Sequence, residues 1–191
     1  MSAAAAAPPR PTIPEHVGRL AMIARWKPVH VGQAAVLEAL VERADHVILG
    51  IGSTNRYNAR NPFTAAESAT MIRSVLRGHD GYTIVEVPDL DDGPRWRLMV
   101  KEMLGPLDLF VTANGYVRGL LLEDYPVLHP VHLVPPERRV QVDGTGVRAA
   151  MAHGEGWREL VPPEVERFLD ERGLVHRFRA EFGAEILAGA R

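Results

Sequence analysis

The stretch Arg19-Leu-Ala-Met-Ile-Ala-Arg-Trp-Lys-Pro-Val-His-Val-Gly-Gln33 decides the fold of this chain. It predicts an apolar strand at 20–24, a cationic turn that contains Arg25 and Lys27, and a helix that begins at Val31. In an open α/β sheet, ligands bind in the crevice at the carboxyl ends of the strands. A helix that begins there offers unpaired N–H groups and the positive end of its dipole to an anion. The stretch therefore predicts a phosphate site at the end of a buried strand.

The length and composition favour one globular domain and exclude several classes of function. The chain has 191 residues, 46% of them hydrophobic, and a net charge of −2. A nucleic-acid-binding protein usually carries a basic stripe, so neither nucleic acid nor a membrane is expected as a partner. The sequence has no cysteine, which excludes disulfides and thiolate metal sites. No apolar run approaches the roughly 20 residues that a membrane span needs, and a cytoplasmic protein is expected.

The chain divides into three parts. Residues 1–15 are rich in Ala and Pro, a composition that predicts a flexible tail. Their opening Ala run is too short, and too uncharged at its start, for a signal peptide. Residues 16–155 carry the alternating pattern of one α/β domain. Residues 156–191 predict C-terminal helices that pack on this domain.

Apolar runs and helical periodicities alternate along the α/β domain. The expected strands are 20–24, 46–51, 82–87, 107–112 and 131–134, and the expected helices are 31–44, 65–77, 95–103, 116–123 and 145–153, followed by a helical tail over 157–187. Thr64 and Glu67 have the spacing of a capping box at the start of the second helix. Strands that alternate with helices indicate βαβ units. The predicted fold class is α/β, a Rossmann-like five-stranded parallel sheet with a helical C-terminal tail.

Several turns at the expected strand ends contain residues that suit a nucleotide site. They are the segments 25–33, 52–64 and 89–96, the turn at Asn114 and the helix start at 143–148. Backbone amides can bind phosphates, cations offset their charge, and an aromatic side chain can stack on a ring. Other classes of site fit less well. Gly50-Ile-Gly52 lacks the third glycine of a dinucleotide fingerprint, and there is no Walker A loop.

At these positions the sequence resembles the archaeal-type nicotinamide mononucleotide adenylyltransferases, a family in the H-x-G-H nucleotidyltransferase superfamily. Residues 24–33, A-R-W-K-P-V-H-V-G-Q, correspond to the family loop G-R-x-Q-P-x-H-x-G-H. Further matches, in the family's order, are I-G-S at 51–53, N-P-F-T-A-x-E at 61–67, part of D-I-x-x-N-x-x-W at 89–96, S-G-N-P at 112–115, S-G-T-E-x-R at 143–148 and G-x-x-W-x-x-L-x-P at 154–162. The resemblance covers about residues 19–180.

The resemblance implies that an acceptor phosphate attacks the α-phosphorus of a nucleoside triphosphate and releases pyrophosphate. The implied catalytic residues are Arg25, His30, Gln33 and Arg148. The implied nucleotide-binding residues are Ala24, Trp26, Lys27, Gly32, Asn114, Gly115, Asp143, Gly144 and Thr145, with the Trp26 indole itself expected to pack in the core. The implied acceptor-binding residues are Gly52, Ser53, Arg56, Arg60, Asp89, Leu90 and Trp96. Mg²⁺ is the implied cofactor, carried on the phosphates without a protein ligand, and family relatives suggest a homo-oligomer.

Four departures from the family pattern concern the charge of the site and the recognition of the acceptor and the base. Gln33 replaces the second histidine and cannot carry a proton or a positive charge. Asp143 replaces a serine, which puts a carboxylate near the expected triphosphate. Gly93 stands where the family has the asparagine that reads the nicotinamide amide, and Gly115 replaces a proline in the base-binding turn.

These departures leave three functions open. The first expectation is transfer of CMP from CTP to a small phosphonate, as in the phosphonoformate cytidylyltransferase branch of phosphinothricin biosynthesis. A small dianion needs cations, and Lys27, Arg56 and Arg60 are candidates. The alternative is transfer of AMP from ATP to nicotinamide mononucleotide. The third function, motivated by Gln33 and Asp143, is a nucleotide-binding protein without catalysis.

Overall fold

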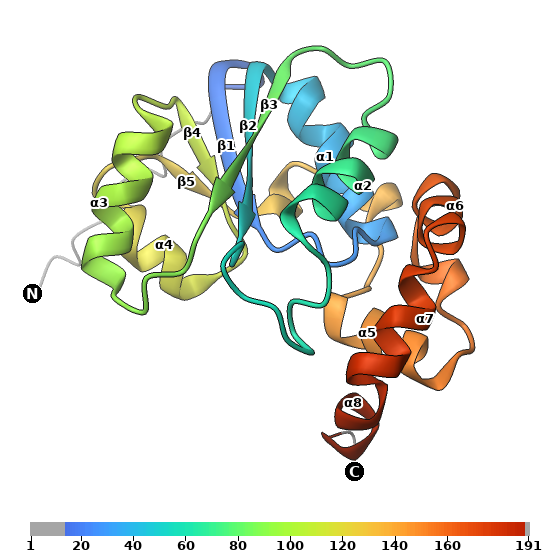
Figure 1. The fold of residues 1–191 in the computed structure, drawn as a ribbon. Coiled ribbons are helices and arrows are strands. Elements are labelled where there is room, and N and C mark those ends of the chain that lie inside the picture. The colour runs from blue at the N-terminus through green and yellow to red at the C-terminus, as the bar shows by residue number, and fades with distance from the viewer. Residues whose placement is uncertain (1–13, 190–191) are drawn as a thin grey trace, which may run out of the picture.

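The computed structural model describes residues 14–189 and contains one five-stranded parallel sheet (Figure 1). The strand order is β3-β2-β1-β4-β5. The strands are β1 (Val17–Ala24), β2 (Ala44–Gly52), β3 (Tyr82–Val87), β4 (Leu109–Val111) and β5 (Val127–Leu128). The predicted fold class is confirmed. Most of the predicted tail, residues 1–13, lies outside the described residues.

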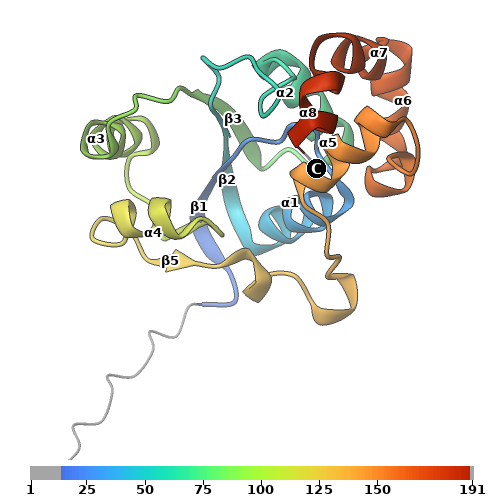
Figure 2. The ribbon, with the colours of Figure 1, turned by 90° about the horizontal axis from the view of Figure 1, so that it is seen from below.

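Helices cover both faces of the sheet. One face carries α1 (Val31–Arg43) and α2 (Ala65–Val75), and the other carries α3 (Gly93–Leu104) and α4 (Gly115–Leu121), as Figure 2 shows along the strands. The later helices α5 (Gly144–His153), α6 (Pro163–Glu171), α7 (Leu174–Phe178) and α8 (Ala184–Gly189) pack on the side of α1 and α2. Three short 3₁₀ helices lie at η1 (Pro130–His132), η2 (Pro136–Arg138) and η3 (Arg158–Leu160), and η4 (Arg179–Gly183) is a π-helix between α7 and α8. None of the helices in this range is long and apolar enough to cross a membrane.

The central strand β1 is apolar on both sides because helices cover both faces of a parallel sheet. Leu20 and Met22 belong to the core cluster under α1, α2 and the C-terminal helices. Ala21 belongs to the cluster under α3 and α4. Leu20 is paired with Val47 of β2 on one side and with Leu109 of β4 on the other. This pairing places β1 in the middle of the sheet.

The strand order reverses direction at β1. After β1 the chain proceeds to β2 and β3 on one side, and it then returns to β4 and β5 on the other. The loops after β1 and β4 therefore separate at the carboxyl edge of the sheet and leave a crevice there. Ligands of open α/β folds bind at such a switch point.

The predicted fifth strand was wrong: the observed strand begins four residues earlier and ends six residues earlier. The sequence predicted it at 131–134, but the strand is Val127–Leu128. Two backbone hydrogen bonds join this segment to β4 and its end: Phe110 N–H donates to Pro126 O at 2.8 Å, and Thr112 N–H donates to Leu128 O at 3.0 Å. Pro130 has no N–H to donate to a sheet. The His129 imidazole also accepts the N–H of Val131 at 3.2 Å, and η1 forms instead of a strand.

The C-terminal helices are attached to the α/β domain through Arg177. Its guanidinium donates to both carboxylate oxygens of Glu67, at 2.6 and 2.8 Å, and to Pro62 O at 3.2 Å. Glu67 also completes the predicted capping box with Thr64 at the start of α2. One side chain therefore joins α7 to the loop that precedes α2.

We expect Arg177→Ala to lower the free energy of unfolding by about 2 kcal/mol, because half-buried hydrogen bonds to a charged group are lost. Arg158→Ala is the matched control. Arg158 also pairs with two carboxylates, Glu166 and Asp170, but its side chain is 49% exposed. Exposed ion pairs contribute under about 1 kcal/mol. Urea unfolding measures both values, and equal losses would contradict the anchoring role of Arg177.

Candidate active site

A cavity of about 710 Å³ lies at the switch point of the sheet. Its walls come from the ends of β1 and β4, the start of α1, and the segment that leads into α5. The sequence-predicted residues that line it are Ala24, Arg25, Trp26, Lys27, His30, Gly32, Gln33, Gly52, Ser53, Asp89, Trp96, Asn114, Gly144, Thr145 and Arg148. Turns that are far apart in the sequence thus meet around one space.

Three buried or half-buried cations line this cavity without a carboxylate partner among residues 14–189. Lys27 is 2% exposed and Arg148 is 8% exposed, while Arg25 is half-buried. The Lys27 ammonium donates to Ser53 O at 2.9 Å. Arg148 donates to Lys27 O at 3.2 Å and to Thr145 Oγ1 at 3.4 Å, and its Nε has no partner among the described residues. Buried charges are normally paired, so this cluster indicates an anion site.

The pKa values of these groups reflect the burial and the mutual repulsion. Burial lowers the pKa of Lys27 to about 8, with Asp89 opposing and Arg25 adding to the shift. Burial lowers the pKa of Arg148 to about 10, and repulsion from Arg25 and Arg60 adds to it. An anion in the cavity would relieve both effects, because it restores a partner to each cation.

His30 is the N-cap of α1. Its Nδ1 accepts the N–H of Gln33 at 3.3 Å, so the neutral ring carries its proton on Nε2. Burial lowers the pKa of His30 to about 4, and the neutral form dominates at pH 7. His30 is therefore a neutral hydrogen-bond donor in this cavity, beside the unpaired N–H groups of the first helical turn.

Gly32 allows this helix start to approach the segment before α5. A Cβ at position 32 would lie 3.2 Å from Val140 O and 3.3 Å from His30 Nδ1. Contacts this short require a neighbour to move. A side chain here would therefore disturb both the His30 cap and the wall of the cavity.

The other end of the cavity is acidic and aromatic. Asp89, Trp96 and Asn114 line both the main cavity and an adjoining hollow of about 250 Å³. Asp91 and Asp92 add two more carboxylates to this hollow. The cavity and this hollow together thus have a cationic half near β1 and α5 and an acidic half near α3 and α4, where Arg56 offsets part of the charge of Asp91 and Asp89.

Some predicted site residues lie elsewhere. Arg56 forms ion pairs with Asp91 and Asp89 and does not line the cavity, and Arg60 is exposed outside it. Leu90 lines only the adjoining hollow, and Gly115 and Asp143 line neither space. Sequence reasoning placed these residues by their neighbours in the chain, whereas ion pairing and helix direction decide where they point.

Two predicted residues have structural roles. The Asp143 carboxylate accepts the N–H of Gly146 at 2.8 Å as the N-cap of α5, a role that Ser and Asp fill about equally well. The Trp26 indole is fully buried and donates to Gly50 O at 2.9 Å, so it packs in the core as expected while its backbone borders the cavity.

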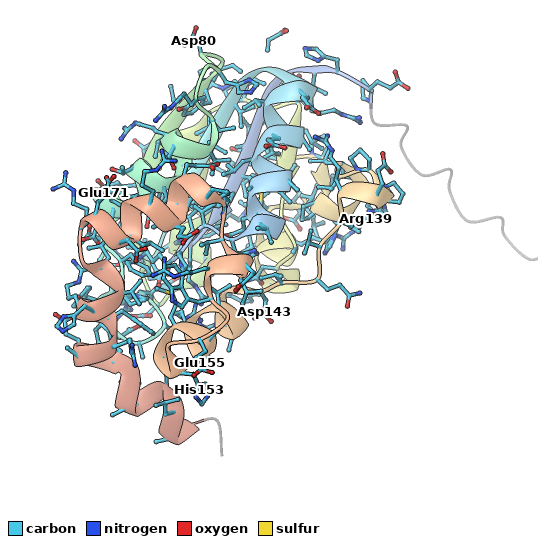
Figure 3. The ribbon with its side chains drawn as sticks, turned by 90° about the vertical axis from the view of Figure 1, so that its right-hand side faces the viewer. Asp80, Arg139, Asp143, His153, Glu155 and Glu171 are labelled. Carbon is cyan, nitrogen blue, oxygen red and sulfur yellow. The ribbon has the colours of Figure 1, made fainter. Side chains whose placement is uncertain are left out.

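Arg138 and Arg139 also line the cavity, although the sequence favoured a solvated loop for them. Arg138 pairs with Glu38 and Glu42 of α1, and Arg139 donates to Val134 O at 2.9 Å. Figure 3 labels Arg139 and Asp143 on the segment that runs into α5. In the sequence, the signal for this wall was a pair of adjacent arginines separated by three residues from the 143–148 turn.

Solved structures with this fold include nucleotide adenylyltransferases. A bifunctional NMN adenylyltransferase/ADP ribose pyrophosphatase from Francisella tularensis superposes with a TM-score of 0.63 and 19% identity, over 86% of this chain and 52% of that chain. This chain thus spans about half of that protein. A putative nicotinate-nucleotide adenylyltransferase from Vibrio parahaemolyticus gives a TM-score of 0.57 and 19% identity, over 85% and 96%. These likenesses establish the fold.

Relatives with higher sequence identity establish the family as well as the fold. No protein-family model matches the sequence. A nicotinamide-nucleotide adenylyltransferase from Methanocorpusculum labreanum is 38% identical over 160 residues, which are 82% of this chain and 93% of that protein. One from Picrophilus torridus is 34% identical over 165 residues, 84% and 95%. The fold, the cation-lined cavity and these relatives define the chain as a nucleotidyltransferase. More narrowly, it belongs to the nicotinamide-nucleotide adenylyltransferase family.

Proposed function

We propose that this protein transfers AMP from ATP to nicotinamide mononucleotide and releases pyrophosphate. The observation that supports this most is the division of charge along the cavity. The half formed by β1 and α5 carries Arg25, Lys27 and Arg148, while the half formed by α3 and α4 carries carboxylates. A triphosphate matches the first half, and a mononucleotide with a cationic pyridinium ring matches the second.

The chemistry needs positioning more than proton transfer. An oxygen of the acceptor phosphate forms a bond to the α-phosphorus, and the bond from that phosphorus to the pyrophosphate oxygen breaks. Both phosphates are ionised near pH 7, so no proton has to move. Arg25, Lys27 and Arg148 offset the developing charge, and His30 Nε2–H and the amides at the start of α1 add directed donors.

Mg²⁺ belongs to this proposal as an ion that accompanies the triphosphate. Within residues 14–189 no three His, Asp or Glu side chains gather into a metal-binding group. The nearby Asp143 carboxylate already caps α5. These residues fit an ion held by the substrate's phosphates, where it neutralises part of their charge.

The structure gives less support to CMP transfer onto a small phosphonate, which the sequence favoured first. That reaction was expected to use Lys27, Arg56 and Arg60 for the dianion. Arg56 is engaged by Asp91 and Asp89, and Arg60 lies outside the cavity.

The test is a panel with purified protein and Mg²⁺, in which ATP or CTP is combined with nicotinamide mononucleotide or phosphonoformate. We expect pyrophosphate release with ATP and nicotinamide mononucleotide, and mass spectrometry should identify the dinucleotide. Turnover confined to CTP and phosphonoformate would refute the proposal. Absence of pyrophosphate with every pair would instead favour a non-catalytic nucleotide-binding protein.

The activity should also fall above about pH 8. The free enzyme's kcat/KM follows ionisations of the free site, and the pKa of Lys27 is lowered to about 8. The substrate phosphates are already fully ionised there, since their last pKa lies near 6 to 7. Raising the pH therefore removes the Lys27 charge and weakens binding of the phosphates. In Lys27→Arg the fall should move to higher pH, and a wild-type profile that stays flat to pH 9.5 would contradict this role.

A further inference from the structure

Gly93, at the start of α3, leaves a space that Tyr116 of α4 fills. A Cβ built on Gly93 would lie 2.2 Å from Tyr116 Oη and 3.2 Å from both Tyr116 Cζ and Leu120 Cδ2. Real Cβ atoms essentially never show a contact of 2.2 Å. The phenol thus occupies the position where a side chain at 93 would stand, and the two residues are complementary.

This pair forms part of the wall of the hollow that adjoins the main cavity. Gly93 and Tyr116 line that hollow together with Trp96 and Asn114, which also line the main cavity. The Tyr116 side chain is exposed, and its hydroxyl has no hydrogen-bond partner between residues 14 and 189. The hydroxyl can therefore serve a ligand without breaking a contact within the protein.

The surroundings of the hydroxyl limit which ligand groups it can serve. Asp89, Asp91 and Asp92 line the same hollow. Arg56 pairs with Asp91 and Asp89, so three carboxylates face one cation and the net charge stays negative. This charge disfavours a carboxylate on the ligand, because like charges repel. A phenol hydroxyl both donates and accepts, so a neutral carboxamide suits it.

We propose that Tyr116, held in place against Gly93, is a specificity-determining residue that selects an acceptor with a neutral, hydrogen-bonding substituent on its flat ring. This inference rests on the proposed function, since it assigns the acidic half of the cavity to the acceptor. It adds a residue that the sequence did not single out and that has a defined partner in Gly93.

The first test is Tyr116→Phe, which removes one oxygen from an exposed side chain and leaves the ring. We expect kcat/KM for nicotinamide mononucleotide to fall about tenfold, the loss typical of one neutral hydrogen bond, while KM for ATP and the unfolding midpoint stay unchanged. The ratio of kcat/KM for nicotinamide mononucleotide to kcat/KM for nicotinic acid mononucleotide should decrease as well. An unchanged kcat/KM for the acceptor would overturn the inference.

A double-mutant cycle tests whether Gly93 acts through the hydroxyl. Gly93→Ala should reduce kcat/KM for the acceptor in the wild-type background, because the exposed Tyr116 ring has to move away to make room for the new methyl and its hydroxyl leaves its position. In the Tyr116→Phe background the same change should cost less, because the 2.2 Å contact is gone and only the 3.2 Å contacts to the ring carbon and Leu120 Cδ2 remain, which makes the two effects non-additive. The control is Gly119→Ala, also in α4, where an added Cβ meets nothing within 4 Å.

The outcomes separate this inference from the proposed function. If the wild type forms the dinucleotide but Gly93→Ala costs the same in both backgrounds, the role of Tyr116 is wrong and the function stands. If the wild type neither binds nor converts nicotinamide mononucleotide, the proposed function fails, and the inference fails with it.

Discussion

Replacing Arg148 by Ala should reduce kcat/KM for pyrophosphate release by 10²- to 10³-fold, an effect typical of losing one donor to a transition-state charge. Arg148 is 8% exposed, has no carboxylate partner among the described residues, and its Nε is unpaired. It holds this position through hydrogen bonds to Lys27 O and Thr145 Oγ1. The guanidinium is thus fixed before substrate binds, so its loss removes an organised charge.

Arg148→Lys separates charge from geometry in this experiment. A lysine keeps the charge but cannot reproduce the planar fork of donors, so we expect activity between those of the wild type and the alanine variant. Gln33→His serves as the second comparison. Gln33 is on the same cavity wall, and its Oε1 has no hydrogen-bond partner within residues 14–189. Its side chain is not the N-cap and carries no charge. We expect it to retain activity within about fivefold. Equal losses in Arg148→Ala and Gln33→His would contradict the roles assigned to both.

The sequence predicted the features that depend on local chemistry. The apolar run at 20–24 had to be a buried strand, and Thr64 and Glu67 cap α2 as expected because that motif needs only four consecutive residues. The convergence of the turns was also predictable, since the carboxyl ends of parallel strands share one edge. For that reason the sequence predicts that Arg25, His30 and Arg148 lie at one cavity, and they do.

Features that depend on which distant residue a side chain contacts were not predictable from the local sequence. Arg56 looks like a free cation in the sequence, but the loop after β3 brings Asp91 to it across 35 residues. Asp143 looked like a repulsive charge beside phosphates, and α5 uses it as a cap. Val131 and its apolar neighbours suggested a strand, but Pro130 and the His129 cap form a turn. In each case a second interaction outside the local pattern decided the outcome.

Replacing Lys27 by Met should have opposite effects on activity and stability. Methionine keeps the length and apolar stem of lysine but removes the charge. We expect kcat/KM to fall about 100-fold, because the ammonium at the end of β1 no longer offsets phosphate charge. We also expect the free energy of unfolding at pH 7 to rise by about 1–2 kcal/mol, since replacing a buried ion by an apolar group of similar volume is often stabilising. The hydrogen bond to Ser53 O is lost, which limits the gain.

The stability gain should depend on pH in a defined direction. The pKa of Lys27 in the folded protein is about 8, below the ordinary 10.5 of a lysine. Between these values the unfolded chain binds the proton more strongly than the folded protein, so the wild type becomes more stable as the pH rises. The advantage of Lys27→Met should therefore be largest below pH 8 and should shrink towards pH 10.5.

Lys101→Met is the matched control for this experiment. Lys101 is 43% exposed and pairs with Asp124 at 2.6 Å, so its charge has a partner and carries no comparable burial penalty. We expect this variant to keep full activity and to be no more stable than the wild type. Urea unfolding at pH 7 and at pH 10 measures both variants. If Lys27→Met loses stability in proportion to its loss of activity, Lys27 is a structural support for the Ser53 turn. If it gains stability while activity collapses, the buried ammonium is retained for its action on phosphate, at a cost to the fold.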